Sequence, residues 1–348
     1  MTAMAPARLV SVIVPCRNEA AHIAAFCASA TAQRLPPAWS LEVVVADGRS
    51  DDGTRALLDA LATRDPRFAV IDNPRRIVST GLNAAIARAR GEVIVRMDVH
   101  TTYAPDYVAQ CLAALEASGA DNVGGPWRAE AGAHAAPMQR AIAAVFQSRW
   151  LAGGARSRAL DYTGPVDTVY LGAWPRATFE RFGGFDEALV RNQDDEHNLR
   201  IVRGGGRVWQ SAAIRSAYRP RGSIGALWRQ QLQYGYWKPF VLRKHGQPAA
   251  LRHLLPGAFV VLFGAATLAA LLGASAWPLM LLAGAYAAML SAATLSTARR
   301  VDAGVALRVP AVIAAYHFGY GIGSLLGWVD VLRGAGAGEA GFFARLTR

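Results

Sequence analysis

The sequence is poor in charge and in cysteine. Of its 348 residues 18% are charged and 53% are hydrophobic, and only three are cysteines. Three cysteines are too few for a disulfide scaffold. Because Cys16, Cys27 and Cys111 are odd in number and lack metal-type spacing, buried, reduced thiols are expected. The high apolar content excludes a disordered or collagen-like chain. We expect no secretory signal peptide, because the apolar run Leu9–Val14 is too short and no cleavage-type site follows it.

Charge is absent altogether from Leu254 to Thr297, a run of 44 residues. At about 1.5 Å per residue, this length suffices for two helical crossings of a hydrocarbon core of about 30 Å. The stretch Val309–Val329 also lacks Asp, Glu, Lys and Arg, and it predicts a third crossing or a re-entrant segment. We therefore expect a transmembrane region over 254–332, with helices at 255–273, 277–297 and 309–331 and a tail at 333–348.

Basic residues flank these apolar segments on one side. They precede the first segment and separate the second from the third: Arg243, Lys244, Arg252, Arg299, Arg300 and Arg308. The positive-inside rule then predicts a multi-pass protein of the inner (cytoplasmic) membrane, with the large preceding domain in the cytoplasm. Three crossings would put the basic tail outside, whereas a re-entrant third segment would keep it inside.

The charge balance is basic, with 37 Lys and Arg against 25 Asp and Glu and a net charge of +12. Most of this excess lies before residue 254. The arginines are scattered and no nucleic-acid-binding motif occurs, so we expect no nucleic-acid partner. A basic domain next to a membrane anchor is better suited to anionic lipid or to a diphosphate-bearing lipid.

The first 125 residues alternate short apolar runs with helix-like segments. Strands are expected at Leu9–Val14, Leu41–Ala46, Phe68–Ile71 and Glu92–Met97. This alternation predicts an α/β domain whose mostly parallel sheet is covered by helices. Ligands of such sheets bind beyond the carboxyl ends of the strands.

Polar segments follow three of these strands: Pro15-Cys-Arg-Asn-Glu19, Asp47-Gly-Arg-Ser-Asp-Asp-Gly-Thr54 and Asp98-Val-His100. Each alone could be a turn or a helix start, but together at one sheet edge they indicate a ligand site. The dinucleotide and P-loop glycine motifs are both missing, which disfavours an NAD-binding fold and a P-loop protein. A carboxylate after the second strand could hold a base or ribose, and one after the fourth strand could hold a divalent cation.

These three motifs, followed by Gly183-Gly-Phe-Asp-Glu187 and Gln193-Asp194, resemble those of inverting family 2 glycosyltransferases with the GT-A fold. The details are most similar to the succinoglycan-type (ExoA-like) membrane-bound branch, which also has Asp-x-His and C-terminal membrane helices. The resemblance implies a cytoplasmic GT-A glycosyltransferase domain over 1–235, joined to the membrane region by an interfacial linker at 236–253.

The resemblance also implies roles for the strand-end residues. Pro15 and Glu19 match the first nucleotide-binding loop of the family. Asp47 matches the carboxylate that reads the uracil or ribose of a nucleotide-sugar. We prefer it to Asp51 and Asp52 because the usual pair of acids at this place is reduced to one.

Four further residues would complete the donor site. Arg76 and Asn83 lie where the family contacts nucleotide or diphosphate, and Asp98 matches the metal-binding Asp. His100 replaces the second acid of the motif, and its imidazole suits Mn²⁺ better than Mg²⁺. Positions 98 and 100 fall on one side of an extended segment, so both could meet one divalent ion. A purely structural role for His100 is the alternative.

Asp194 takes the place of the family's catalytic base, with Gln193 where Glu is usual. The resemblance implies a single displacement in which this base removes the proton of the acceptor hydroxyl while the nucleoside diphosphate departs. The anomeric centre is inverted, without a covalent enzyme intermediate. The alternative for this segment is an acidic, solvated helix start.

The segment Trp228–Lys238 contains the residues that could bind an acceptor: Gln230, Trp237 and Lys238. The Gln-x-x-Arg-Trp motif of processive members is imperfect here, because Tyr234 and Gly235 stand where Arg-Trp is usual. A basic, aromatic helix before a membrane span is equally typical of an interface anchor.

Together these features predict a metal-dependent inverting glycosyltransferase. It would move a hexose, from a UDP-sugar, to a lipid-linked glycan acceptor in polysaccharide or glycolipid biosynthesis. The alternatives are a polyprenyl-phosphate sugar synthase and a non-catalytic, membrane-tethered nucleotide-sugar binding or assembly protein. The oligomeric state is left open.

Overall fold

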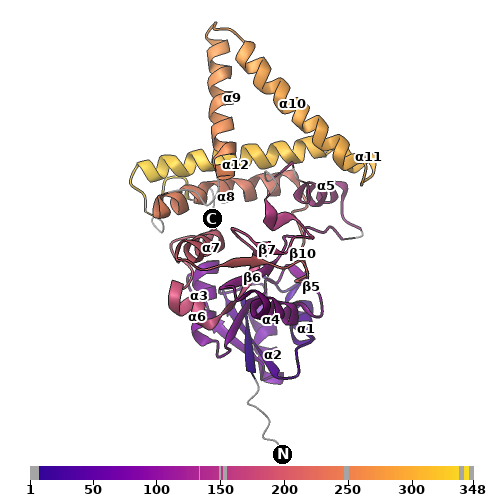
Figure 1. Cartoon of the computed structure of the whole chain (residues 1–348), viewed down its shortest axis with the longest axis vertical. Helices are drawn as coiled ribbons and strands as arrows, with labels where there is room; N and C mark the ends of the chain where they lie inside the picture. The colour runs from indigo at the N-terminus through magenta and orange to yellow at the C-terminus, as the bar shows by residue number, and fades with distance from the viewer. Residues whose placement is uncertain are drawn as a thin grey trace, which may run out of the picture. The chain divides into compact units, whose positions relative to one another are not determined.

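The computed structural model describes residues 8–132, 134–148, 150–151, 155–246, 251–336 and 341–344. The chain forms two compact units. The N-terminal unit combines Met1–Arg128 with Arg156–Tyr218, and the C-terminal unit combines Ala129–Ala155 with Arg219–Arg348. Figure 1 labels most of their helices and some of their strands.

The N-terminal unit is built on a mixed sheet, which among the described residues has the strand order β3-β2-β1-β4-β8-β6-β9-β7. Its first four strands in the chain are parallel: β1 (Arg8–Cys16), β2 (Trp39–Asp47), β3 (Phe68–Asp72) and β4 (Val93–Arg96). The strands β6 (Asn122–Gly125), β7 (Gly164–Pro165), β8 (Tyr170–Pro175) and β9 (Val208–Gln210) extend it. A separate ribbon pairs β5 (Thr101–Tyr103) with β10 (Ser216–Tyr218).

Helices connect and cover these strands: α1 (Ile23–Thr31), α2 (Thr54–Arg64), α3 (Val78–Arg88), α4 (Tyr107–Ser118), α6 (Arg176–Phe182) and α7 (Gln193–Arg203). A single turn, η1 (Arg156–Arg158), lies between β6 and β7 in the chain. The predicted α/β fold is thereby confirmed. The sheet as a whole is mixed, because strands β8 and β7 pair antiparallel with their neighbours.

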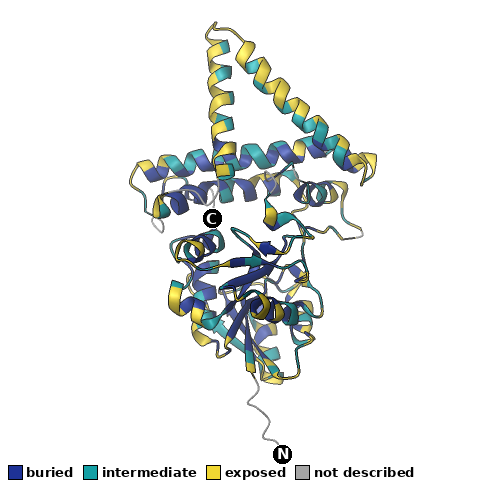
Figure 2. Ribbon diagram, in the orientation of Figure 1, coloured by how far each residue is buried: buried dark blue, intermediate teal, exposed yellow. Residues whose placement is uncertain are grey.

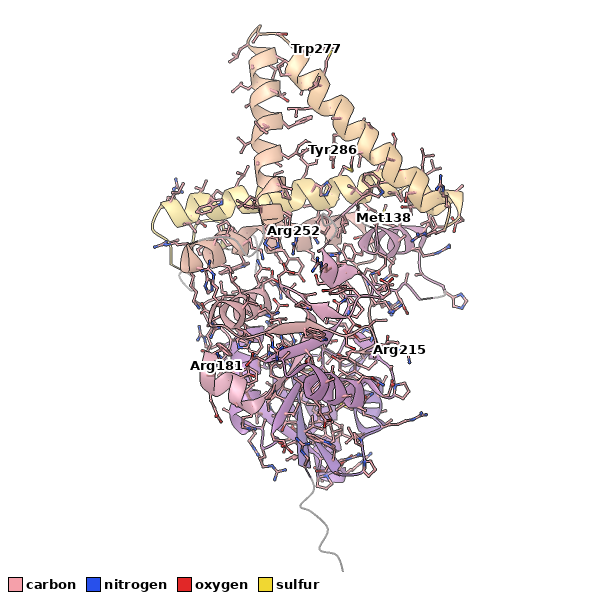
Figure 3. All side chains as sticks on the ribbon, in the orientation of Figure 1. Met138, Arg181, Arg215, Arg252, Trp277 and Tyr286 are labelled. Carbon is pink, nitrogen blue, oxygen red and sulfur yellow. The ribbon has the colours of Figure 1, made fainter. Side chains whose placement is uncertain are left out.

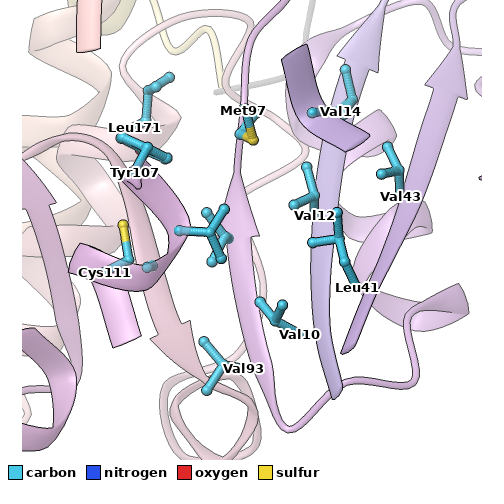
Figure 4. Packing of buried hydrophobic residues seen from close by; sticks show 14 of the residues in the cluster. Val10, Val12, Val14, Leu41, Val43, Val93, Met97, Tyr107, Cys111 and Leu171 are labelled. Atoms are coloured by element: carbon cyan, nitrogen blue, oxygen red, sulfur yellow. The ribbon is translucent and has the colours of Figure 1, made fainter. Parts of the chain in front are cut away.

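The sheet has a hydrophobic layer on each face, because alternate residues of a strand point to opposite sides. Val10, Val12 and Val14 of β1 pack in one layer with residues of α1 and α4, including Cys27 and Cys111 (Figure 4). Ile13 of β1 packs in the other layer with residues of β2 and α3. The three cysteines are buried free thiols, as their spacing predicted.

The C-terminal unit is helical. It contains α5 (Pro137–Phe146), α8 (Ile224–His245), η2 (Leu251–His253), α9 (Leu255–Leu271), α10 (Trp277–Ala298), α11 (Ala303–Ala306) and α12 (Val309–Leu332). Helices α9 and α10 form a hairpin, and α12 lies alongside α8 across its base (Figure 1). Tyr286 of α10 faces α9, where its ring centroid is 4.9 Å from that of Phe259 (Figure 3).

Glycines determine how α12 packs on α8. Gly319, Gly323 and Gly327 recur every four residues and therefore share one face of α12. A Cβ placed at Gly323 would overlap the carbonyl oxygen of Leu232, and one placed at Gly327 would overlap that of Tyr236. The two backbones therefore touch, and the glycine-rich pattern belongs to a helix–helix contact.

Two helical stretches are long and apolar enough to cross a membrane, Trp277–Ala298 and Ala303–Leu332, and α9 is a shorter apolar helix. Side chains of α9 and α10 are mostly exposed (Figure 2). By contrast, 50% of the apolar window within Ala303–Leu332 is buried inside the protein.

The compact units do not divide the chain where the sequence suggested. The expected boundary at 235/236 falls inside α8, which runs unbroken from Ile224 to His245. Much of α8 is buried on both sides of this boundary because it packs along α12, so residues 236–245 form no separate linker. The segment Ala129–Ala155 also groups with the C-terminal unit.

Candidate active site

Asp47 ends β2 and is 2% exposed. The Ser50 hydroxyl donates a hydrogen bond to its Oδ1 at 2.6 Å, and the Ser50 amide donates to its Oδ2 at 3.3 Å. The guanidinium of Arg55 lies 3.9 Å from Oδ2. In register, Asp47 pairs with Cys16 of β1 and Asp72 of β3, so it lies at the carboxyl edge of the sheet.

The loops after β1 and β2 are joined by hydrogen bonds. The side chain of Asn18 donates to Asp51 at 2.9 Å, and the Glu19 amide donates to the Thr54 hydroxyl at 2.7 Å. Hydrogen bonds, first from the Thr54 hydroxyl, lower the pKa of Asp52. Asp51 and Asp52 therefore serve the contact between the loops.

Asp98 and His100 follow β4 and have different partners. Arg96 donates to both carboxylate oxygens of Asp98, from Nε and Nη2, each at 2.8 Å. Nε2 of His100 lies 2.7 Å from Oε1 of Glu19, which belongs to the loop after β1. The hydroxyl of Tyr103 accepts from the Asp98 amide at 2.6 Å and fixes the backbone here. Glu19, Asp98 and His100 thus gather at the edge where they were predicted.

Asp194 lies in the first turn of α7 and is partly buried. Burial alone would lower the pKa of Arg96, but the charges of Asp98 and Asp194 raise it above the ordinary value. Asp194, the expected base, and Asp98, the expected metal ligand, therefore both affect the charge state of Arg96.

The segment 183–187 holds α7 in place. Arg200 donates to the carbonyl oxygens of Phe182 at 2.7 Å and of Gly184 at 2.8 Å, and it also pairs with the buried Glu196 at 2.6 Å. Nε2 of His197 lies 3.1 Å from the carbonyl oxygen of Gly183. These contacts anchor the helix whose first turn carries the predicted base.

Asn83 has a structural position. Its Nδ2 donates to the Phe185 carbonyl at 2.8 Å and to Glu187 at 3.0 Å, and its Oδ1 accepts from the Phe185 amide at 2.8 Å. Both ends of the amide therefore bind protein groups, and a nucleotide contact of Asn83 stays a prediction. Arg76 is exposed, in a left-handed conformation before α3. Pro15 lies within β1, one residue before its end.

The three residues expected to bind an acceptor lie on α8 in the C-terminal unit. Gln230, Trp237 and Lys238 are 7%, 1% and 5% exposed. The Trp237 ring packs between Tyr236 and Phe240, with centroids 5.4 and 5.3 Å away. Burial among neighbouring helices leaves these side chains little surface for a sugar, so we do not retain them as acceptor contacts.

Two features of the site were not anticipated. The first is Arg96, which ends the buried strand β4. A charged residue at the end of an apolar run is the pattern by which the sequence could have revealed it. The second is an aromatic group in which Trp127 stacks on Tyr170 with centroids 6.0 Å apart and Arg158 lies 4.5 Å above the Trp127 ring. Tyr170 is linked to the Asp98 segment, because its hydroxyl lies 2.7 Å from that of Thr101.

The donor atoms at this edge fit a divalent cation that arrives with a substrate. Across the part of the chain that the structure describes, no group of three or more His, Cys, Asp and Glu side chains could hold a metal ion. Asp98 and His100 supply one carboxylate and one imidazole. Mg²⁺-type sites commonly use one or two protein carboxylates and complete their shell with substrate phosphates and water, so two protein ligands are enough for such a site.

Comparisons with known proteins place the chain in a family. The family model described as "Glycosyl transferase family 2" matches residues 11–167. The chain is 33% identical over 266 residues to the succinoglycan biosynthesis protein ExoA of Rhizobium meliloti (strain 1021), covering 73% of this chain and 76% of that protein. It is 23% identical over 242 residues to a dolichyl N-acetyl-alpha-D-glucosaminyl phosphate 3-beta-D-2,3-diacetamido-2,3-dideoxy-beta-D-glucuronosyltransferase of Methanococcus voltae, covering 68% and 74%.

A solved structure shares the fold. The mannosyltransferase PcManGT from Pyrobaculum calidifontis, in complex with GDP-Man and Mn²⁺, superposes with a TM-score of 0.57 at 22% identity. The similarity covers 91% of this chain and 86% of that one. Together with the identity to ExoA over most of both chains, these matches show that the chain belongs to glycosyl transferase family 2 and is a glycosyltransferase.

Proposed function

We propose that this glycosyltransferase moves a hexose from a UDP-sugar to a lipid-linked glycan at the cytoplasmic face of a membrane, with inversion at the anomeric carbon. The observation that carries the proposal is the gathering of Asp47, Asp98 and His100 at one sheet edge.

Each residue has a separate task in this proposal. Asp47 holds the nucleoside, since its buried carboxylate is fixed by Ser50 at the carboxyl end of β2. Asp98 and His100 would hold a divalent cation, which neutralises charge on the departing diphosphate. Asp194 takes the proton of the attacking acceptor hydroxyl, a step that a positioned carboxylate commonly accelerates by about 10² to 10⁴-fold.

The names of the relatives support the choice of substrates. ExoA is a succinoglycan biosynthesis protein, and the Methanococcus voltae enzyme is named for a dolichyl-phosphate-linked sugar. PcManGT was solved with a nucleotide-sugar and Mn²⁺. A lipid-linked acceptor also suits a chain with apolar helices of membrane-crossing length.

For the membrane we propose a two-crossing arrangement. The α9–α10 hairpin would cross and return, because its apolar side chains are mostly exposed (Figure 2). Helix α12 would lie in the interface, since its glycine face packs on α8 and since Arg308 and Arg333 stand at its two ends. Two crossings keep the basic tail in the cytoplasm, in agreement with the positive-inside rule.

A donor panel tests the function. The purified full chain would be incubated with UDP-, GDP- and dTDP-sugars, Mn²⁺ and either lipid extract or polyprenyl phosphate, and products identified by mass. We expect one hexose to be added to a lipid-linked glycan from a UDP-sugar. A product formed on polyprenyl phosphate would identify a polyprenyl-phosphate sugar synthase instead. Donor binding without any transfer would overturn the proposal in favour of a binding protein.

A further inference from the structure

Arg96 is a buried cation placed directly on the predicted metal ligand. Its side chain is 8% exposed, and it occupies both oxygens of Asp98 through two bonds of 2.8 Å. The two residues are separated by two positions on an extended segment, so their side chains leave the backbone on the same side. Charge-assisted, two-point contacts of this kind are among the stronger hydrogen bonds in proteins.

A divalent cation at Asp98 therefore meets a positive charge already bound to its carboxylate. Arg96 opposes the cation in two ways, since it competes for the carboxylate lone pairs and repels a second positive charge. Nη1 of Arg96 is buried and has no hydrogen-bond partner within the described residues. Nη1 could therefore donate to a second anionic group, and the charge of Asp194 also acts on the guanidinium.

We propose that Arg96 competes with the divalent cation for Asp98, so that tight cation binding depends on the diphosphate of the donor. The proposal rests on the metal role given to Asp98 under the proposed function. The diphosphate supplies negative charge and oxygen ligands, which offset the repulsion by Arg96. Cation and nucleotide therefore bind with positive coupling, and by thermodynamic linkage each strengthens the other equally.

The test is a Mn²⁺ titration of the purified full chain, with free Mn²⁺ followed by electron paramagnetic resonance, in the absence and presence of UDP. Replacing Arg96→Gln removes the competing charge, so Mn²⁺ alone should bind about tenfold more tightly. In Arg96→Gln, the ratio of Mn²⁺ affinity with UDP to Mn²⁺ affinity without UDP should fall by a similar factor. Arg96→Lys keeps the charge but only one point of contact, and it should fall between the wild type and Arg96→Gln.

Matched variants separate the possible causes. Arg90 also pairs with a carboxylate, that of Glu42 at 2.9 Å, and it precedes β4 at the opposite end of that strand. Arg90→Gln should leave Mn²⁺ affinity unchanged. Asp98→Ala should abolish the Mn²⁺ binding that Arg96 controls. Circular dichroism checks that each variant is folded. If Arg96→Gln does not fold, the comparison of Arg96→Lys with the wild type provides the test.

Unchanged or weaker Mn²⁺ binding in folded Arg96 variants overturns the proposal, since Arg96 would then orient Asp98 for the cation rather than compete with it. If the wild type binds Mn²⁺ but Asp98→Ala binds it equally, the metal role of Asp98 fails as well. Sugar transfer measured in the same preparations keeps that failure distinct from a failure of the glycosyltransferase activity.

Discussion

Glu19 and His100 meet at 2.7 Å although strands β2, β3 and β4 lie between them in the sequence. Metal-bound histidines commonly donate their second ring N–H to a carboxylate, which fixes the ring orientation and the tautomer. The contact with Glu19 holds Nε2 of His100 in this manner. The loop expected to contact the nucleotide would then also support the metal ligand.

Glu19→Ala should raise the Mn²⁺ concentration needed for half-maximal sugar transfer by about tenfold, because His100 loses its orienting partner. Glu19→Gln should have a smaller effect, since its amide oxygen can still accept from Nε2. The measurement is Mn²⁺-dependent transfer in the two variants, in His100→Ala and in Glu19→Ala/His100→Ala. If the two alanine effects simply add, the side chains act independently.

Asp194→Asn should reduce sugar transfer by about 10² to 10⁴-fold while leaving donor binding unchanged, because only the proton acceptor is lost. Transfer rates and donor titrations on the same preparation check this. Asp195→Asn is the matched control, since it changes the next acid of the same helical turn. Normal turnover by the Asp194 variant would show that the base lies elsewhere.

Gly323→Ala should destabilise the C-terminal unit by about 1–3 kcal/mol, because the new Cβ would overlap the Leu232 carbonyl oxygen and push α12 from α8. Gly284→Ala on α10 is the control, since a Cβ there has no neighbour within 4 Å. Thermal unfolding in detergent measures both. Equal melting temperatures for the two variants would contradict the close contact of α8 and α12.

His197 should make the N-terminal unit less stable in mild acid. Its burial lowers its pKa to about 4 from the ordinary value of 6.5, so the folded protein holds the ring neutral while the unfolded chain takes up a proton. The stabilising contribution is complete above pH 6.5 and is lost as the pH falls toward 4, by on the order of 3 kcal/mol in all. In His197→Gln, the change in unfolding temperature between pH 7 and pH 5 should be smaller than in the wild type. An identical pH dependence would assign the acid sensitivity to other groups.

The two-crossing arrangement predicts that both ends of the chain lie in the cytoplasm. A green fluorescent protein fused after Arg348 should fluoresce, and alkaline phosphatase fused there should be inactive. Phosphatase inserted in the α9–α10 turn near Gly273 should be active, which controls for export. Active phosphatase after Arg348 would mean that α12 also crosses the membrane.

The sequence was informative where function depends on residues next to one another. Apolar, β-branched runs marked β1 and β2, and polar residues at their ends marked the site edge. Contacts between distant segments could not be predicted in this way. Asn83 binds Phe185 across 102 positions, a pairing that no local pattern encodes. Likewise, an apolar, glycine-rich helix suits lipid or a neighbouring helix equally, so the contact of α12 with α8 required the structure.

The hydrogen bonds between the loops after β1 and β2 have a mechanical consequence. Asn18, Glu19 and Ala20 each donate a backbone amide to a side chain of the other loop, at 2.9, 2.7 and 3.0 Å. Two segments joined at three successive amides should move as one piece. These amides should accordingly exchange with deuterium more slowly than their place at a loop surface would suggest.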